Sequence, residues 1–274
     1  MSRATQSLWF ALIYSIYLVA VMEPVQWLVI RPLAALLPRR RDAIQRAWLH
    51  GQGRWILTLA RSVGGMRLEI QGALPKASCV VLANHQSLID IPILVALMNG
   101  PAPLIPMRAS YARGIPGIST IVRMGRHPLL AQGERATRAE HRALLEAAAR
   151  VARGERSLLL FPEGHRSRDG AIGPFMAAGF ERIMARVPER PVYVVVIDGL
   201  TELRTFADIA LRISGTRARV AVRGPFAIPA DAEARAGFLD RLRGEMVAAL
   251  VGLRERDAAP LPSPAAKPHA RLAG

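Results

Sequence analysis

Cysteine and lysine are almost absent from this chain. Cys79 is the single cysteine among 274 residues, so no disulfide can form within the chain, and the composition fits a reducing compartment. Lysine occurs only at Lys76 and Lys267, so arginine carries nearly all of the basic charge. The formal net charge of +16 favours anionic partners such as acidic lipid headgroups, phosphorylated substrates or nucleic acid. A general bias toward arginine explains the same charge equally well.

Several catalytic signatures are also missing. The sequence has no G-x-S-x-G elbow of a serine hydrolase, and neither a G-x-G-x-x-G turn nor a P-loop follows a strand. The six histidines and the one cysteine do not have the spacing of a zinc site. Nothing resembles a helix-turn-helix or an aromatic and basic platform for nucleic acid. These absences weigh against hydrolase, dinucleotide, zinc and nucleic-acid functions.

Long apolar runs are concentrated at the N-terminus. Residues 8–22 are uncharged and mostly apolar, a second run follows the interruption at Glu23-Pro24, and three arginines stand at 39–41. A helix of fifteen residues spans about 22 Å, less than the hydrocarbon core of about 30 Å. We expect residues 1–41 to form two short apolar helices that dip into one leaflet, with Trp9 and Trp27 at the interface.

Other interpretations of the N-terminus remain open. A signal peptide requires a cleavage site with small residues, and none follows the apolar run. A single spanning helix would carry Glu23 and Pro24 near its middle. Two ordinary helices covering the core are a further alternative.

The rest of the chain alternates between strand and helix patterns. Apolar or alternating stretches predict strands at 66–70, 79–83, 103–107, 157–161, 192–197 and 218–223. Helices are predicted at 42–63, 91–99, 134–153, 175–187 and 231–256. This order predicts an α/β fold with a single mixed, mainly parallel sheet covered by helices. We expect one domain at 42–257 and a disordered tail at 258–274.

The first candidate site is the sequence NHQSLID at 84–90, which directly follows a predicted strand. Open α/β sheets place functional groups just past the ends of their strands. His85 can take a proton from a hydroxyl near neutral pH, and Asp90 can fix its tautomer if the chain turns after His85. The spacing by itself favours a plainer role, with Asp90 as a helix N-cap and His85 as a loop residue.

The second candidate site is the sequence FPEGHRSRDG at 161–170, at the end of another predicted strand. Gly164 lets the backbone approach a ligand closely, and the planar guanidinium of Arg166 suits a phosphate. Glu163 can hold that arginine or a substrate hydroxyl. The alternative is a polar turn between strand and helix, which explains less well why both apolar strands end in such sequences.

Taken together, these two blocks closely resemble the glycerophospholipid acyltransferase family, which includes the lysophosphatidic acid acyltransferases. The hallmarks of that family are N-H-x-x-x-x-D and a later F-P-E-G-T-R-S. NHQSLID matches the first, and FPEGHRS at 161–167 matches the second at all but one position, in this order and each after an apolar strand. The resemblance covers about residues 65–225. The apolar N-terminus is similar to the two-helix membrane anchor of the family.

The resemblance implies a membrane-bound O-acyltransferase of phospholipid biosynthesis. It would transfer a fatty acyl chain from acyl-CoA or acyl carrier protein to 1-acylglycerol 3-phosphate, giving phosphatidic acid, without metal, cofactor or covalent enzyme intermediate. His85 would be the general base and Asp90 its orienting partner. The family's acceptor-binding block matches Glu163, Gly164, Arg166 and Ser167, with Arg166 on the acceptor phosphate.

The sequence departs from the family pattern in two places. His165 stands where the family usually has threonine. The middle block, commonly G-x-x-F-I-x-R, is matched in outline by GISTIVR at 117–123, with Thr120 in the aromatic position. By distance to the later block, RHPLLAQ at 126–132 fits better, but it ends in Gln132.

The arginine of that middle block is thought to bind the acceptor phosphate, and Arg123, Arg126 or Arg135 could replace it. The identity of the acceptor is therefore more open than the reaction type. Another lysophospholipid or a lyso-aminolipid is the main alternative acceptor.

The expected partners are the acyl donor, the lysolipid acceptor and an anionic membrane surface, but not nucleic acid. The expected location is the cytoplasmic face of a membrane, the inner membrane in a bacterium. A remote alternative is a non-catalytic basic protein that binds membranes or nucleic acid, but such a protein has no need for two polar blocks after two strands.

Overall fold

The structure is a computed structural model that describes residues 2–131 and 137–258. Its strands are β1 (Arg67–Gln71), β2 (Val80–Ala83), β3 (Pro103–Leu104), β4 (Met107–Arg108), β5 (Leu129–Leu130), β6 (Ser157–Leu160), β7 (Val192–Asp198) and β8 (Arg217–Phe226). Its α-helices are α1 (Arg3–Ile16), α2 (Glu23–Val25), α3 (Arg31–Leu36), α4 (Arg41–Ser62), α5 (Asp90–Leu97), α6 (Ile118–Gly125), α7 (Arg138–Ala152), α8 (Ala177–Met184), α9 (Phe206–Arg212), α10 (Ala232–Ala236) and α11 (Phe238–Ala258). Two π-helical and two 3₁₀ segments complete the set, namely η1 (Tyr17–Met22), η2 (Gln26–Ile30), η3 (Pro38–Arg40) and η4 (Ala109–Ala112).

Six strands form one mixed sheet in the order β1-β8-β7-β2-β6-β3. All neighbouring pairs are parallel except β7 and β8, which run antiparallel. The predicted α/β fold with a mainly parallel sheet is therefore confirmed. A separate parallel pair joins β4 to β5.

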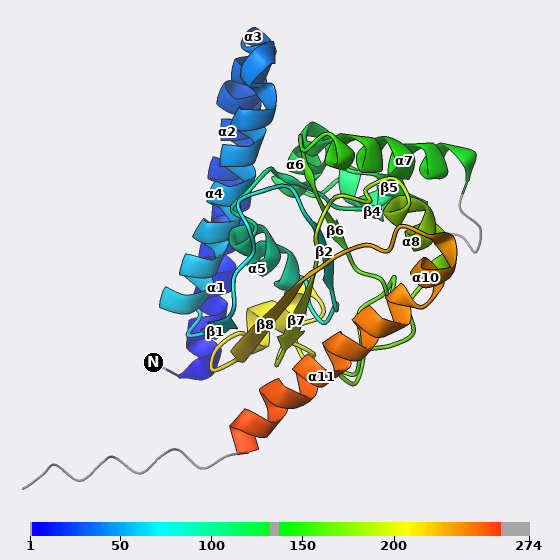
Figure 1. Ribbon diagram of the computed structural model, residues 1–274. Coiled ribbons are helices and arrows are strands. Elements are labelled where there is room, and N and C mark those ends of the chain that lie inside the picture. Colours follow the sequence, from blue (N-terminus) through cyan, green and yellow to red (C-terminus); the bar gives the residue numbers. More distant parts are fainter. Residues whose placement is uncertain (1, 132–136, 259–274) are drawn as a thin grey trace, which may run out of the picture.

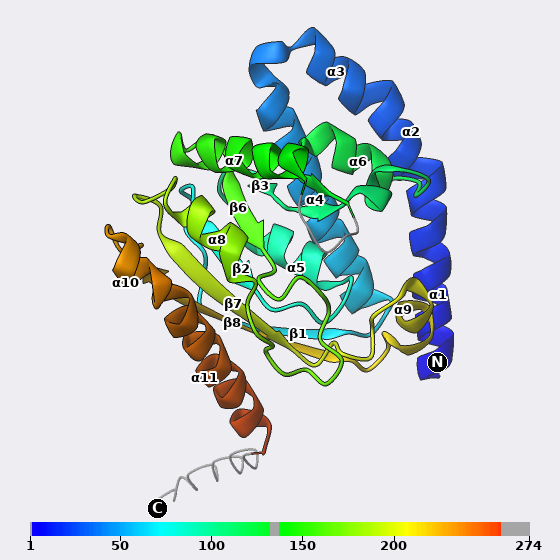
Figure 2. The ribbon, with the colours of Figure 1, turned by 90° about the vertical axis from the view of Figure 1, so that its right-hand side faces the viewer.

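Helices cover both faces of this sheet (Figures 1 and 2). Successive strand residues alternate between the faces, so Val81 packs in the core shared with α1, α4, α5 and α9. Val80, its neighbour, packs in the opposite core, shared with α7, α8 and α11. Burial on both faces explains why the central strands are continuous apolar runs in the sequence.

The N-terminal apolar segment is one continuous helix through residues 3–36, not two short ones. Figure 2 shows it running along the domain and turning at its far end into α4, which returns beside it. The backbone N–H groups of Glu23 and Arg31 bond to carbonyls five residues back, at Leu18 and Gln26. The wider π turns give room to the proline that follows each of them, so neither proline ends the helix.

This helix is long and apolar enough to cross a membrane, by length and composition. Only 17% of its most apolar window is buried against the protein, so most of its apolar surface faces outward. Exposed apolar side chains on it are Leu8, Trp9, Leu12, Ile16, Val19, Val21, Trp27, Leu28, Val29, Leu33 and Leu36.

Three other predicted elements differ in detail. The strand expected at 103–107 is two short strands, β3 and β4, that belong to different sheets. The C-terminal helix is divided into α10 and α11 at Gly237. The helix expected from residue 134 begins at Arg138, where Thr137 and Glu140 form a capping box, and 132–136 lie outside the described residues. The expected tail lies outside them as well, except for Ala258 at the end of α11.

Candidate active site

The two polar blocks and the end of a third strand meet at one edge of the sheet. β2 is parallel to both of its neighbours, β6 and β7, so the carboxyl ends of all three strands lie at the same edge. The first block follows β2 and the second follows β6, while Asp198 ends β7. Such an edge is where open α/β sheets place their functional groups.

His85 and Asp90 form a hydrogen-bonded pair. Nδ1 of His85 lies 2.8 Å from Oδ2 of Asp90, which also accepts from the backbone N–H groups of Gln86 at 2.6 Å and Ser87 at 2.7 Å. The Asp90 side chain is fully buried, whereas 16% of the His85 side chain is exposed. Because the carboxylate accepts at Nδ1, the proton of the neutral ring lies there, and Nε2 keeps a lone pair that can accept a proton.

The plainer role of Asp90 as a helix N-cap is wrong for this structure. Asp90 is the first residue of α5, and no side chain caps that helix. Its carboxylate instead binds the turn of Gln86 and Ser87, which lies before the helix. Ser87 in turn donates to the carbonyl of Leu203, which fastens the same turn to the loop after β7.

The ring of Phe161 covers one face of His85. The two ring centroids are 4.2 Å apart, and the planes differ by 23°, so the rings are stacked. Phe161 begins the second block, immediately after β6. The stack therefore fixes the imidazole plane from a second strand, and sequence analysis had assigned no role to this residue.

Backbone hydrogen bonds join the second block to the first. Glu163 is buried and uses both oxygens, accepting from His85 N at 3.4 Å and from Gly173 N at 2.9 Å. Ser167 N donates to His85 O at 2.7 Å. In this structure Glu163 therefore orders the backbone of the two blocks. It does not bind Arg166, and neither of its oxygens is left open for a substrate hydroxyl.

The remaining residues of the second block form a tight loop. Gly164 has a φ of +71°, a conformation that favours glycine. Ser167 lies buried and donates to Asp169 at 3.1 Å. Hydrogen bonds from Ala171 N and from that serine hold the pKa of Asp169 below its ordinary value. His165 is exposed and can reach a ligand from solvent.

Arg166 is partly buried and donates from Nη1 to the carbonyl of Arg204. Its other guanidinium nitrogens make no hydrogen bond to the described part of the chain. They remain available to an anionic group.

A network beside the turn of Gln86 and Ser87 includes residues that the sequence did not indicate. Gln86 accepts from Leu200 N at 3.0 Å and contacts Asp198, which also receives Arg219 and two nitrogens of Arg254. Burial raises the pKa of Asp198, but the bonds and charges of these arginines outweigh it, so the net pKa is lowered. An acidic residue ending an apolar strand, as in VVVID, is the signal that could have indicated Asp198.

The two candidate phosphate arginines of the middle region are separated. Arg123 lies on α6 and, together with Arg113, lines an open hollow of about 510 Å³. Arg126 is the exposed C-cap of α6, with a φ of 52°, and does not line that hollow. Gln132 and Arg135 lie outside the described residues.

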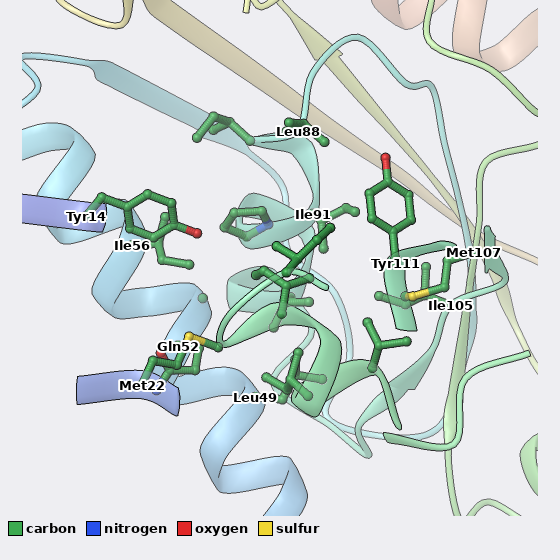
Figure 3. Close-up of a pocket in the computed structure, with 18 of the residues that line it drawn as sticks. Tyr14, Met22, Leu49, Gln52, Ile56, Leu88, Ile91, Ile105, Met107 and Tyr111 are labelled. Atoms are coloured by element: carbon green, nitrogen blue, oxygen red, sulfur yellow. The ribbon is translucent and has the colours of Figure 1, made fainter. Parts of the chain in front are cut away.

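A largely apolar cavity of about 170 Å³ adjoins the first block. Leu88 and Ile89, between His85 and Asp90, form part of its wall. In Figure 3, Tyr14 and Ile56 lie on one side of the cavity and Tyr111 and Met107 on the other. The N-terminal helix, α4, α5, η4 and α6 all contribute lining side chains, so the cavity is assembled from segments far apart in the sequence.

Among the described residues, no group of three or more His, Cys, Asp or Glu side chains is placed to hold a metal ion.

Comparison with known proteins finds a match to a family model and a solved structure with a similar fold. A family model described as acyltransferase matches residues 66–198. The crystal structure of the 1-acyl-sn-glycerophosphate (LPA) acyltransferase PlsC from Thermotoga maritima is similar, with a TM-score of 0.65 and 22% sequence identity, over 94% of this chain and 97% of that one. No curated protein sequence matches significantly. At this identity the structural similarity establishes the fold.

Proposed function

We propose that this chain, whose residues 66–198 match the acyltransferase family model, transfers a fatty acyl chain from an acyl thioester to the free hydroxyl of 1-acylglycerol 3-phosphate. The product is phosphatidic acid. The His85–Asp90 pair carries this proposal, since it leaves Nε2 of a partly exposed imidazole free to accept a proton. The structurally similar PlsC is an acyltransferase named for the same kind of acceptor, which supports this choice of substrate.

His85 acts as the general base. Nε2 removes the proton of the acceptor hydroxyl while its oxygen forms a bond to the thioester carbonyl carbon. The carboxylate of Asp90 stabilises the imidazolium through Nδ1. When the tetrahedral intermediate collapses, the carbon–sulfur bond breaks and the thiolate takes the proton from Nε2. The ester is formed, the free thiol leaves, and His85 returns to its neutral state.

The apolar cavity supports a fatty acyl substrate. A long hydrocarbon chain is stabilised by removal from water, by about 0.8 kcal/mol for each buried CH₂ group. Leu88 and Ile89, which line the cavity, stand between His85 and Asp90 in the chain. We therefore expect the carbonyl end of an acyl chain held in the cavity to lie toward the first block. The acyl donor is acyl-CoA or acyl carrier protein. Its thioester reaches His85 from solvent, where part of the imidazole is exposed.

Arg166 and Arg123 supply the charge that the acceptor phosphate needs. Arg166 offers free guanidinium donors beside the first block, and Arg123 faces the open hollow across η4 and α6. His165 and the altered middle block are the two places where the proposed acceptor-binding residues differ from the family pattern.

The exposed apolar helix at 3–36 supports attachment to a membrane surface, where the acceptor resides. Arginines 39–41 follow it and suit acidic headgroups. We place the enzyme on the cytoplasmic face, where acyl thioesters are available.

The decisive experiment measures acyl transfer by the purified protein in anionic vesicles, with labelled acyl-CoA and lysophosphatidic acid. We expect labelled phosphatidic acid from the wild type and at least about 100-fold slower formation by His85→Ala. Other lysophospholipids and a lyso-aminolipid are offered in parallel. Use of one of these in place of lysophosphatidic acid would change the proposed acceptor, whereas activity retained by His85→Ala would overturn the mechanism.

A further inference from the structure

Two polar side chains in the middle of the apolar helix point at the acyltransferase domain. Glu23 accepts from Gly117 N at 2.5 Å, and Gln26 donates to Gly117 O at 2.9 Å, so together they bind both sides of one backbone residue. Gln26 is fully buried. A carboxylate is costly in an apolar helix unless hydrogen bonds compensate it, which indicates a specific task for Glu23.

Gly117 is shaped for this contact. Its φ of +71° favours glycine, and an added Cβ would lie 2.9 Å from the sulfur of Met22 and 3.1 Å from Leu18. The backbone therefore approaches the helix as closely as it can. Because Gly117 caps the start of α6, the contact fixes where that helix begins.

Thr120 extends the contact to Arg123. Its hydroxyl donates to Glu23 at 2.9 Å and accepts from Nη2 of Arg123 at 3.1 Å. Nη1 of Arg123 donates to Ala112 O at 2.6 Å. Both terminal nitrogens of the guanidinium are thus held. A phenylalanine, which the family pattern has at position 120, offers no hydroxyl for this connection.

The held guanidinium faces a place where an anionic group fits. Arg123 and Arg113 line the same open hollow, together with Ser110. The segments that form this hollow, η4 and α6, also line the apolar cavity, through Tyr111 and Ile121. A phosphate-bearing lipid can therefore meet cationic groups on one side of η4 and α6 while apolar groups lie on the other.

We propose that Glu23 is a positioning residue for acceptor binding, acting through Thr120 on Arg123. This inference rests on the proposed function and adds a residue from the membrane-attached helix to acceptor recognition. A long arginine side chain loses conformational freedom when it binds a phosphate, and orienting it beforehand reduces that loss. Acceptor affinity should then depend on the connection while the chemistry at His85 does not.

The test compares Glu23→Gln, Thr120→Val and Thr120→Ser with the wild type in the vesicle assay. Glu23→Gln places an amide N–H₂ where one carboxylate oxygen accepts hydrogen bonds, and Thr120→Val removes the bridging hydroxyl. For both we expect the KM for lysophosphatidic acid to rise about tenfold, with kcat and the KM for acyl-CoA nearly unchanged. Thr120→Ser keeps the hydroxyl and should therefore have the same KM for lysophosphatidic acid as the wild type.

Ser7→Ala is the matched control, because Ser7 fastens the other end of the same helix by accepting from Ser214 N at 3.0 Å. It should leave the acceptor KM unchanged. The Kd for lysophosphatidic acid, measured by calorimetry without an acyl donor, reads the same effect independently of catalysis. Arg123→Gln should raise both the KM and the Kd for lysophosphatidic acid. The double variant with Glu23→Gln should raise these two constants no further.

Two results would overturn the proposal. One is a lower kcat or thermal stability in Glu23→Gln with unchanged acceptor KM and Kd, which would limit Glu23 to docking the helix. The other is a double variant, Arg123→Gln with Glu23→Gln, in which the increases in acceptor KM of the two single variants multiply. If the wild type acylates a different lysolipid, the proposed acceptor fails, and the same variants are compared with that lipid. An unchanged KM for it would then overturn the role of Glu23 as well.

Discussion

Nδ1 of His85 lies 2.8 Å from Oδ2 of Asp90, an oxygen that also receives two backbone N–H groups. One atom therefore orients the imidazole and closes the turn that carries it. Gln86 N and Ser87 N donate to the same carboxylate oxygen that the ring contacts. The orientation of the proposed base is built into the backbone of the first block.

Replacing Asp90→Asn should lower kcat by about 10²–10⁴-fold, because the amide neither fixes the tautomer nor stabilises the imidazolium. The KM for the acyl donor should change little, since the loss occurs in the transition state. His85→Ala should have a similar effect, and the double variant should be no worse than the single ones. Steady-state kinetics with a thermal melt of each variant makes this comparison. Multiplying effects would mean that the two residues do not act as a unit.

Arg254 and Asp198 should be energetically coupled. Arg254 donates two hydrogen bonds to Asp198 and a third, at 2.9 Å, to Gly170 O, so it joins β7 to the second block. A double-mutant cycle with Arg254→Ala and Asp198→Asn should give about 1–2 kcal/mol of coupling in urea unfolding at neutral pH. The folded-state pKa of Asp198 is lowered, so its contribution is present above the ordinary aspartate pKa and is lost as pH falls through the folded value. Coupling that persists under strongly acidic conditions would contradict this.

Much of the fold follows from the sequence because the central strands are buried on both faces. Continuous apolar runs such as residues 192–197 cannot be amphipathic surface elements, and the polar blocks that follow two such runs had to emerge at a sheet edge. That reasoning brought His85, Asp90 and Glu163 to one edge without any knowledge of contacts.

What the sequence could not supply depends on tertiary contacts. Pro24 and Pro32 suggest helix breaks, and only the π turns before them show why the helix continues. The stacking of Phe161 on His85 requires the register between β2 and β6. Beside its local partner Trp27, Glu23 accepts from Gly117 and Thr120, which lie 94 and 97 residues away along the chain, so no local pattern could indicate that contact. The apolar cavity likewise lies between several helices. The hydrophobic periodicity of a single helix does not reveal how the helices pack together.

Filling the cavity should shorten the preferred acyl chain. Leu49 lines it from α4, and Leu49→Trp adds volume there while the residue stays apolar. We expect activity with the longest acyl-CoA chains to fall by about tenfold or more, with shorter chains affected less, because overpacking costs about 1–3 kcal/mol. Leu49→Met keeps the volume and serves as the control. A uniform loss at every chain length would mean that the acyl chain binds elsewhere.

Charges on the outer face of the apolar helix should release the protein from membranes. Leu28 and Leu36 are 76% and 77% exposed, so glutamate at both positions should leave the fold intact. Burial of a leucine contributes about 1.5–3 kcal/mol, so vesicle partitioning should fall roughly 100-fold or more. Val247→Glu with Val251→Glu, on exposed positions of α11, is the matched control. Equal release by both pairs in vesicle sedimentation would remove the special role of the N-terminal helix.

His127 should make stability depend on pH in the weakly acidic range. It is buried, and Nδ1 accepts from Ile105 N at 3.1 Å, which requires that nitrogen to be unprotonated. Burial, assisted by the charge of Arg156, lowers the pKa of His127 to about 4. The unfolded chain takes up this proton near pH 6.5, so the stabilisation is complete above about pH 6.5 and is lost progressively as pH falls toward 4.

The loss should be on the order of 3 kcal/mol in the free energy of unfolding. His127→Asn places a side-chain oxygen where Nδ1 accepts and does not titrate, so its stability should fall less steeply between pH 6.5 and 4. Urea unfolding of both proteins at a series of pH values measures the two slopes. Parallel slopes would show that His127 takes up its proton equally in the folded and unfolded chain, which the buried acceptor position beside Ile105 does not allow.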